Sequence, residues 1–149
     1  MNASGPLPLR HSWPLGEQGR RFDLGLIVES LLMDVIPPLA ADRHYGHRVG
    51  CWECDLGDNS LIWSGGVYDI FGLPRGCEVA RSQAVALYSE DSRAKMEALR
   101  AHAIRHRRGF TLDAEIRPQT GGRRWIRLIC APVLENNRPV RLHGLKFTL

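Results

Sequence analysis

Two cysteine residues lie close enough in this sequence to be considered as ligands of a metal ion. Cys51 and Cys54 stand three residues apart. On a β-strand, residues three apart point to opposite faces, so the two sulfurs cannot share one ion without a bulge. No second pair of ligands follows at the spacing of a zinc finger. We therefore expect both cysteines to pack as ordinary side chains, and we expect no metal site.

Two carboxylates could support general acid–base chemistry. Asp113 and Glu115 alternate along a predicted strand and share one of its faces. Arg117 stands on the same face, which favours a salt-bridged surface over a catalytic pair. Nowhere else does the sequence suggest a nucleophile, a base and an orienting residue that belong together. We therefore predict no catalytic residue and no enzymatic activity.

An alternation of apolar and polar residues predicts the sheet that must position any site. Trp52 and Cys54 fall on one face of the first strand, and the acidic residues beside them fall on the other. Turn residues separate the strands, including Asn136 and Asn137 before the last one. The predicted strands span residues 51–56, 61–63, 110–117, 123–134 and 139–148.

Helices are predicted between the second and third of these strands. The longest begins after Ser89, which can cap it, and runs to about Arg108. A short helix over residues 67–71 ends at Gly72, and residues 78–88 form a short helix or irregular turns. This order indicates an α+β fold, an antiparallel sheet with helices on one face. The inward stripe of the long helix consists of Met96, Leu99, Ala103 and His106.

The region before the sheet divides into two parts. Residues 1–19 contain three prolines and three glycines without apolar periodicity, which predicts a flexible tail. Residues 20–49 comprise an N-terminal helix over 22–36, ended by Pro37, and a polar connector. The apolar face of this helix is wider than one core contact requires. We expect the helix to cover a sheet or to pair with a copy of itself.

Length and composition fit one soluble domain. The chain has 149 residues, of which 44% are hydrophobic, enough for one core. No apolar run reaches the roughly 18 residues of a membrane span. The N-terminus lacks the basic and apolar regions of a signal peptide. We therefore expect a cytoplasmic protein that does not enter the membrane, with its thiols reduced.

Charge is unevenly distributed along the chain. Residues 1–89 carry seven basic and ten acidic side chains, whereas residues 90–149 carry thirteen and six. We favour a solvated surface for the basic half and do not expect nucleic acid as a partner. The alternative is a domain that binds nucleic acid or an acidic protein. Its basic residues would be Arg105, Arg107, Arg108, Arg123, Arg124 and Arg127.

From Gly50 onward the sequence resembles the PAS fold, particularly the subclass common in bacterial sensor histidine kinases and diguanylate cyclases. The similar segments, in chain order, are Gly50–Leu56, Trp63–Ser64, Ile70–Leu73, Glu90–Arg93, Gly109–Arg117, Gly122–Ile126 and Arg138–Gly144. The resemblance implies that residues 50–149 form a PAS domain. It also implies a five-stranded antiparallel sheet of order 2-1-5-4-3 with helices on one face and a small pocket beneath them.

The resemblance further implies a sensory, signal-transducing protein. Its pocket would be lined by Trp52, Cys54, Phe71, Met96, Leu99, Ala103, Leu112, Ala114, Leu128 and Cys130. We favour a pocket filled by these side chains themselves, and the alternative is an unidentified small apolar ligand. No cofactor is required. In haem-binding members a histidine of the long helix ligates the iron, which makes His106 a candidate for a haem sensor. We favour instead a partly exposed histidine beside the helix C-terminus, without haem.

Partners of such a domain are expected at its outer face. In this family the N-terminal helix commonly mediates dimers, so we expect an isologous homodimer. Its contacts would come from Phe22, Leu26, Ile27, Leu31, Val35, Trp125 and Ile129. The closing Asp-Ile-Thr motif of the family is reduced to Thr148-Leu149. We therefore expect either a stand-alone sensor that acts on a signalling protein in trans, or a shortened chain.

Overall fold

Alternating apolar and polar residues build one antiparallel sheet in this chain, of which the computed structural model describes residues 11–23 and 48–149. Its strands are β1 (Ser12–Pro14), β2 (Val49–Asp55), β3 (Leu61–Trp63), β4 (Arg108–Ile116), β5 (Arg124–Glu135) and β6 (Arg138–Thr148). They lie in the order β1-β4-β5-β6-β2-β3. The predicted α+β fold is confirmed, with one correction. The sheet has six strands instead of five, because β1 pairs with the outer edge of β4.

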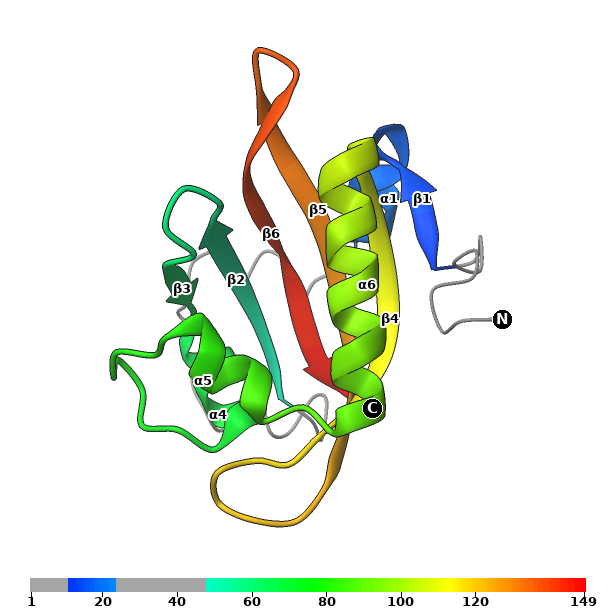
Figure 1. The fold of residues 1–149 in the computed structure, drawn as a ribbon. Helices are drawn as coiled ribbons and strands as arrows, with labels where there is room; N and C mark the ends of the chain where they lie inside the picture. Colours follow the sequence, from blue (N-terminus) through cyan, green and yellow to red (C-terminus); the bar gives the residue numbers. More distant parts are fainter. Residues whose placement is uncertain (1–10, 24–47) are drawn as a thin grey trace.

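Three helices between β3 and β4 cover one face of the sheet (Figure 1). They are α4 (Gly65–Phe71), α5 (Arg81–Ala86) and α6 (Glu90–His106). Their ends follow the predicted signals. Gly72 ends α4 with a left-handed φ of 69°, and the Ser89 hydroxyl accepts a hydrogen bond from the Ser92 amide (3.4 Å) at the start of α6. The long helix ends at Arg107, directly before β4.

The main core fills the space between these helices and the sheet. Phe71 of α4, Leu99 of α6 and Ile126 of β5 are almost completely buried there. Close contact between α4 and β2 depends on Gly50. A Cβ atom at this position would lie 2.5 Å from the backbone nitrogen of Val67. Only glycine therefore allows the helix to approach the strand so closely.

The N-terminal segment packs against the sheet and corrects the predicted flexible tail from His11 onward. It consists of β1, the 3₁₀ turn η1 (Leu15–Glu17) and the short helix α1 (Gln18–Arg21). The physical reason is Trp13, whose side chain is only 1% exposed. Its Nε1 donates a hydrogen bond to Thr111 Oγ1 of β4 at 3.1 Å. Burying this indole stabilises the segment. The sequence did not predict an ordered segment here because its apolar residues show no periodicity.

Trp13 packs on the outer face of the sheet, in a cluster separate from the core beneath α6. Its ring packs in a cluster with Ile129 of β5 and Leu145 of β6. Gly109 stands directly across from Trp13 in the β1–β4 ladder. A Cβ atom on Gly109 would lie 2.2 Å from the indole, so the glycine provides the slot into which the ring fits.

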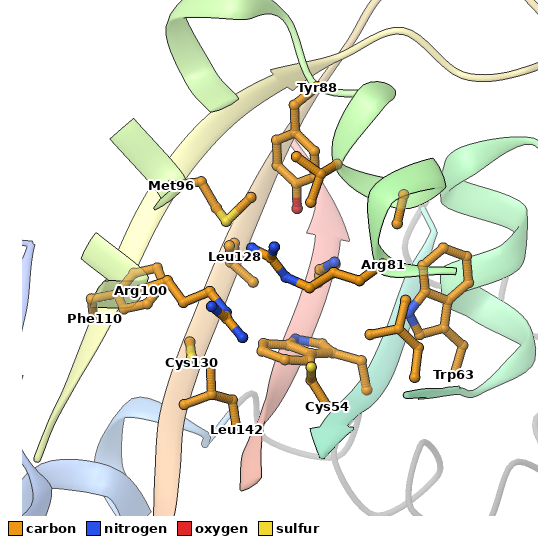
Figure 2. Close-up of a pocket in the computed structure, with 15 residues that line it drawn as sticks. Cys54, Trp63, Arg81, Tyr88, Met96, Arg100, Phe110, Leu128, Cys130 and Leu142 are labelled. Carbon is orange, nitrogen blue, oxygen red and sulfur yellow. The ribbon is translucent and has the colours of Figure 1, made fainter. Parts of the chain in front are cut away.

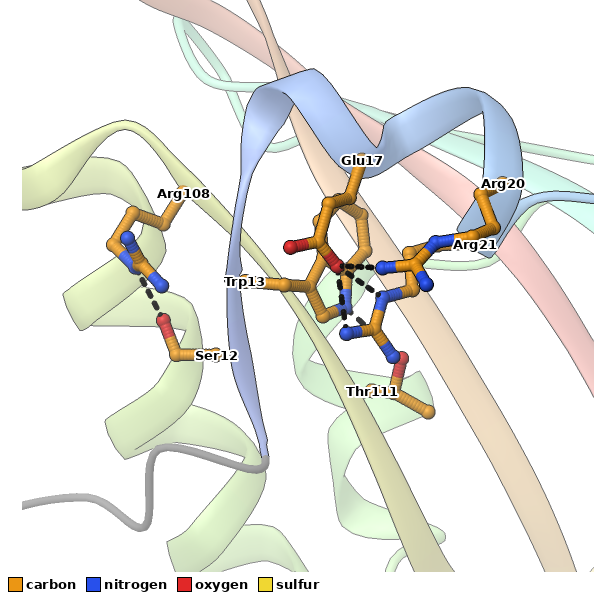
Figure 3. A network of polar contacts seen from close by, with 7 residues as sticks. All are labelled: Ser12, Trp13, Glu17, Arg20, Arg21, Arg108 and Thr111. Carbon is orange, nitrogen blue, oxygen red and sulfur yellow. Dashed lines mark hydrogen bonds and ion pairs between the residues drawn. The ribbon is translucent and has the colours of Figure 1, made fainter.

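Polar contacts hold the ends of this segment (Figure 3). The Glu17 carboxylate accepts hydrogen bonds from Arg20 (2.6 Å) and Arg21 (2.8 Å). Arg108 Nε donates to Ser12 Oγ at 2.7 Å, which ties β1 to the start of β4. These contacts are exposed or only partly buried, so we assign most of the stabilisation to Trp13.

The predicted helix over residues 22–36 falls mainly outside the described residues. Phe22 follows the end of α1 instead of starting a new helix. Its ring contacts Trp13 edge-on, with 6.4 Å between the ring centroids. Among residues 11–23 and 48–149, no helix has the length and hydrophobicity that crossing a bilayer requires.

We expect Trp13→Ala to lower the free energy of unfolding by about 3–5 kcal/mol, the usual range for removing a fully buried tryptophan. Urea unfolding followed by circular dichroism measures this change. Ile62→Ala is the control, because Ile62 is 66% exposed and its removal should cost no more than about 0.5 kcal/mol. Equal effects of the two substitutions would contradict a packed N-terminal segment.

Candidate functional site

A cavity of about 60 Å³ lies between the inner face of the sheet and helices α5 and α6. Strands β2 to β6 form its floor, and α5, Tyr88 and α6 form its roof. Most of the lining side chains are apolar, among them Phe110, Leu128 and Leu142. Figure 2 shows Arg81 and Arg100 extending into the same space from the two helices. The cavity is therefore apolar on most sides, with basic groups among its walls.

The structure divides the predicted pocket residues into two equal groups. Those that line the cavity are Trp52, Cys54, Met96, Leu128 and Cys130. Those that are buried in the core beside it, without reaching its wall, are Phe71, Leu99, Ala103, Leu112 and Ala114. Periodicity correctly identified the inward face of each element. It could not say how far along that face the cavity lies, and contact with a ligand stays a prediction for all ten.

Lys146 places a charged ammonium group in the wall of the cavity. It was not among the residues predicted to line the pocket. It lies on β6, two residues after Gly144, and so shares the inward face of the strand. Its side chain is only 7% exposed. The alternation of β6 was the signal that could have found it, because a lysine occupied a position where an apolar residue was expected.

Four aromatic rings surround the ammonium group of Lys146. The Nζ atom lies 4.8 Å from the ring centroid of Phe71, 5.2 Å from Trp52, 5.7 Å from Tyr88 and 5.8 Å from Trp63. Ring faces attract a cation at these distances, more strongly where water is excluded. The residues that the structure describes form no hydrogen bond or ion pair to Nζ. The rings therefore stabilise the charge only in part.

Burial changes the protonation of the groups around Lys146. Loss of hydration lowers the pKa of Lys146 from 10.5 to about 8, and the nearby Arg81 guanidinium acts in the same direction. Burial also raises the pKa of the Cys130 thiol and of the Tyr88 hydroxyl, so both stay protonated at neutral pH. At pH 7 the Lys146 ammonium therefore lies beside a neutral thiol and a neutral phenol.

Two arginines at the cavity, Arg81 and Arg100, differ in whether their contact partner carries a negative charge. Arg81 forms an ion pair with Glu97 of α6. Arg100 donates a hydrogen bond to the Asn59 side chain at 3.1 Å, which leaves its charge uncompensated by that contact. Among the described residues that line the cavity, none is acidic. The surroundings of the cavity are thus electrically positive.

The candidate haem ligand is placed away from the cavity, which corrects the predicted stripe. The buried face of α6 consists of Ser92, Met96, Leu99 and Ala103. His106 is exposed in the last turn and contacts His102, with 4.5 Å between the ring centroids. The buried face ends one turn earlier than the sequence predicted, so His106 cannot reach the interior from this position.

The cysteines and carboxylates singled out from the sequence do not gather. Cys54 faces the cavity, and Cys51 packs in the outer cluster with Trp13, so the prediction that they face opposite sides is confirmed. In the part of the chain that the structure describes, no three His, Cys, Asp or Glu side chains come together as a metal site. Asp113 pairs with Arg127 at 2.6 Å rather than with Arg117.

The six arginines singled out as a possible nucleic-acid-binding surface do not lie together on one face. Arg108 begins β4, whereas Arg124 lies across from the last residue of that strand. Arg124 donates to the carbonyl oxygen of Ile70 at 2.5 Å, and Arg127 is paired with Asp113. Arg105 and Arg107 are exposed near the end of α6. These placements do not favour the alternative of a nucleic-acid-binding face.

A family model described as the PAS fold matches residues 60–145, more than half of the chain. The chain belongs to the PAS family. Domains of this family are sensory modules in signal transduction, and the predicted resemblance is therefore confirmed. No curated protein matches the chain.

Solved structures show the same fold at low sequence identity. The N-terminal domain of a diguanylate cyclase with a PAS/PAC sensor from Marinobacter aquaeolei is 13% identical, with a TM-score of 0.61, over 67% of this chain and 93% of that one. A sensory box histidine kinase/response regulator from Burkholderia thailandensis is 19% identical, with a TM-score of 0.57, over 74% and 82%. An RNA-binding light-oxygen-voltage receptor is 16% identical, with a TM-score of 0.61, over 68% of this chain and 29% of that one.

We expect Lys146→Met to remove a pH dependence of stability. Between pH 8 and 10.5 the unfolded chain holds a proton that folded Lys146 has released, so the stability of the natural sequence should rise with pH relative to the variant. Below pH 8 the folded chain carries the desolvated ammonium, and the variant should be more stable by up to about 3 kcal/mol. Urea unfolding at pH values on both sides of 8 measures this. A stability difference that is constant with pH would show that Lys146 is hydrated.

Proposed function

We propose that this chain is a non-catalytic sensory module whose cavity receives a small ligand. The observation that carries the proposal is the cavity itself, which places polar hydrogen-bond donors inside an apolar chamber. Sites of this composition bind small molecules, because apolar walls supply affinity and a few polar groups fix orientation. The self-filled interior favoured from the sequence accounts less well for charged groups at these positions.

The cavity is well placed to convert occupancy into a structural change. Its roof includes α5 and Tyr88, and its floor includes the central strands of the sheet. Arg81 of α5 forms an ion pair with Glu97 of α6, so the two helices would respond together to a ligand beneath them. A ligand that binds one arrangement of these helices more tightly shifts the population toward it.

We propose in addition that the chain forms a homodimer through its outer face. Trp125 is 52% exposed on β5, so its indole is accessible to a partner, and tryptophan is a residue type enriched among the strongest interface contacts. Ile129 is buried beneath Trp13, so an arriving partner would contact Trp125 instead. Phe22 follows the end of α1, and Leu26, Ile27, Leu31 and Val35 of the segment after it would complete the interface.

Native mass spectrometry of the protein purified from its own host tests the ligand. We expect an additional mass that denaturation removes. Cys130→Leu adds apolar volume to the cavity wall and should abolish this mass, whereas Cys77→Leu, which lies away from the cavity, should retain it. The proposal fails if the natural protein shows the bare chain mass, or if folded Cys130→Leu keeps the ligand.

Light scattering during size-exclusion chromatography tests the dimer. We expect twice the chain mass of 16.8 kDa. Trp125→Ser should weaken the dimer, because removing an aromatic anchor from an interface commonly costs about 1 kcal/mol or more of binding free energy. Ile62→Ser, at a still more exposed apolar position on β3, should leave it unchanged. A monomeric natural protein at every concentration would contradict the proposal.

A further inference from the structure

The ammonium group of Lys146 lies in the cavity wall with unmet hydrogen-bonding capacity. An ammonium offers three N–H donors and needs oxygen or nitrogen acceptors to satisfy them. The residues described in the structure supply ring faces but no such acceptor. Burying a charged group without hydrogen-bonded partners is costly. The arrangement is therefore stabilised by whatever acceptor enters the cavity.

Trp52 supplies a second unmet donor beside the first. Its indole Nε1 is completely buried and has no hydrogen-bond partner among the described residues. The ring of Trp52 lies 5.2 Å from Lys146 Nζ, and both residues line the cavity. A neutral N–H group and a cation thus belong to residues of one cavity wall, but Nε1 is covered in this arrangement, so an acceptor reaches it only when the side chains around it move. An anion with more than one acceptor oxygen could serve both.

The charged side chains around the cavity favour a ligand with a negative charge. Arg81 is neutralised by Glu97, but Lys146 and Arg100 have no carboxylate partner among the described residues. No acidic side chain of the described residues lines the cavity. A cationic ligand would meet repulsion there, and a neutral one would leave the ammonium uncompensated. An anion satisfies the charge and the donors together.

We infer that the cavity binds a small organic carboxylate whose two oxygens accept hydrogen bonds from Lys146 Nζ and Trp52 Nε1. The inference rests on the proposed function and names its ligand class. The short hydrocarbon body of the ligand packs against Met96, Phe110 and Leu128. A volume of about 60 Å³ is well below that of a pocket for drug-sized ligands, which restricts this body to a few carbon atoms.

The distribution of polar groups favours a carboxylate over an inorganic anion. Phosphate and sulfate carry oxygen atoms in all directions and need donors around them. The guanidinium groups of Arg81 and Arg100 bond to Glu97 and Asn59, which leaves Lys146 and Trp52 as donors without a partner among the described residues. Side chains such as Met96 and Leu128 offer only apolar surface. A ligand with one charged end and one apolar end matches this division.

Isothermal titration calorimetry with three matched probes tests the inference. Butyrate is the anionic probe, butyramide is its neutral isostere and 1-aminobutane is its cationic counterpart, with inorganic phosphate as a fourth arm. We expect butyrate to bind at least about thirtyfold more tightly than butyramide, since a buried charge pair is worth 2 kcal/mol or more. We expect no binding of 1-aminobutane or phosphate.

Two substitutions on one strand assign the effect to the buried cation. Lys146→Met should reduce butyrate affinity by about thirtyfold. Arg138→Met removes an exposed charge from the same strand and should leave the affinity unchanged. Trp52→Phe keeps an aromatic ring but removes the indole N–H, and should reduce butyrate affinity by about tenfold. It provides an independent test if Lys146→Met fails to fold.

The outcomes separate this inference from the proposed function. Equal binding of butyrate and butyramide would overturn the carboxylate assignment and leave a ligand-binding cavity. Binding of phosphate in place of butyrate, lost in Lys146→Met, would overturn it in favour of an inorganic anion. Butyrate binding that survives both Lys146→Met and Trp52→Phe would place the ligand elsewhere. No binding of any probe, together with a bare chain mass from the host, would overturn both.

Discussion

Burial of the Lys146 ammonium on the inner face of β6 is the interaction on which the rest of this interior depends. Four rings approach it, and they come from β2, β3, α4 and the residue just before the α6 cap. These elements must therefore pack in one arrangement for the charge to be tolerated. The same arrangement leaves a cavity, because the ring faces surround the ammonium without filling the space beside it. Packing and the proposed ligand recognition would consequently be two results of one constraint.

The two faces of the sheet have separate roles. The inner face carries the core and the cavity beneath α5 and α6, whereas Trp13 packs on the outer face against Ile129 and Leu145. This division follows from strand alternation, which sends Ile129 outward and places its neighbours Leu128 and Cys130 inward. The N-terminal segment is therefore part of the folded unit. Any partner that contacts the outer face meets this segment as well as Trp125.

Periodicity and local signals predicted the regular elements from the sequence. Asn136 and Asn137 adopt positive φ angles of 51° and 62° between β5 and β6, as their residue types indicated. The order of the strands in the sheet could not be predicted in this way, because alternation does not show which strands are neighbours. That prediction came from the resemblance to the PAS family. β1 could not be predicted because three residues are too few to show an alternation. A lone tryptophan among prolines and glycines was the available sign.

The candidate site was predictable only in part for a related physical reason. Periodicity shows which face of an element is buried, and this placed Trp52, Cys54 and Met96 correctly toward the interior. It says nothing of where packing leaves a gap, so half of the predicted residues lie beside the cavity. The sequence-based prediction of the pocket also took only uncharged, mostly apolar residues as its lining. That criterion excluded Lys146, although its position on the inward face of β6 was already implied.

Protonation of Lys146 is the most direct measure of the environment on which this account depends. The chain contains two lysines, and Lys95 is exposed, so NMR of ¹³C-labelled lysine side chains gives one signal for the buried group and one reference. We predict that the Lys146 signal titrates with a midpoint near pH 8. A midpoint near the ordinary value of 10.5 would show a hydrated ammonium and would contradict the buried, unpaired cation in the cavity.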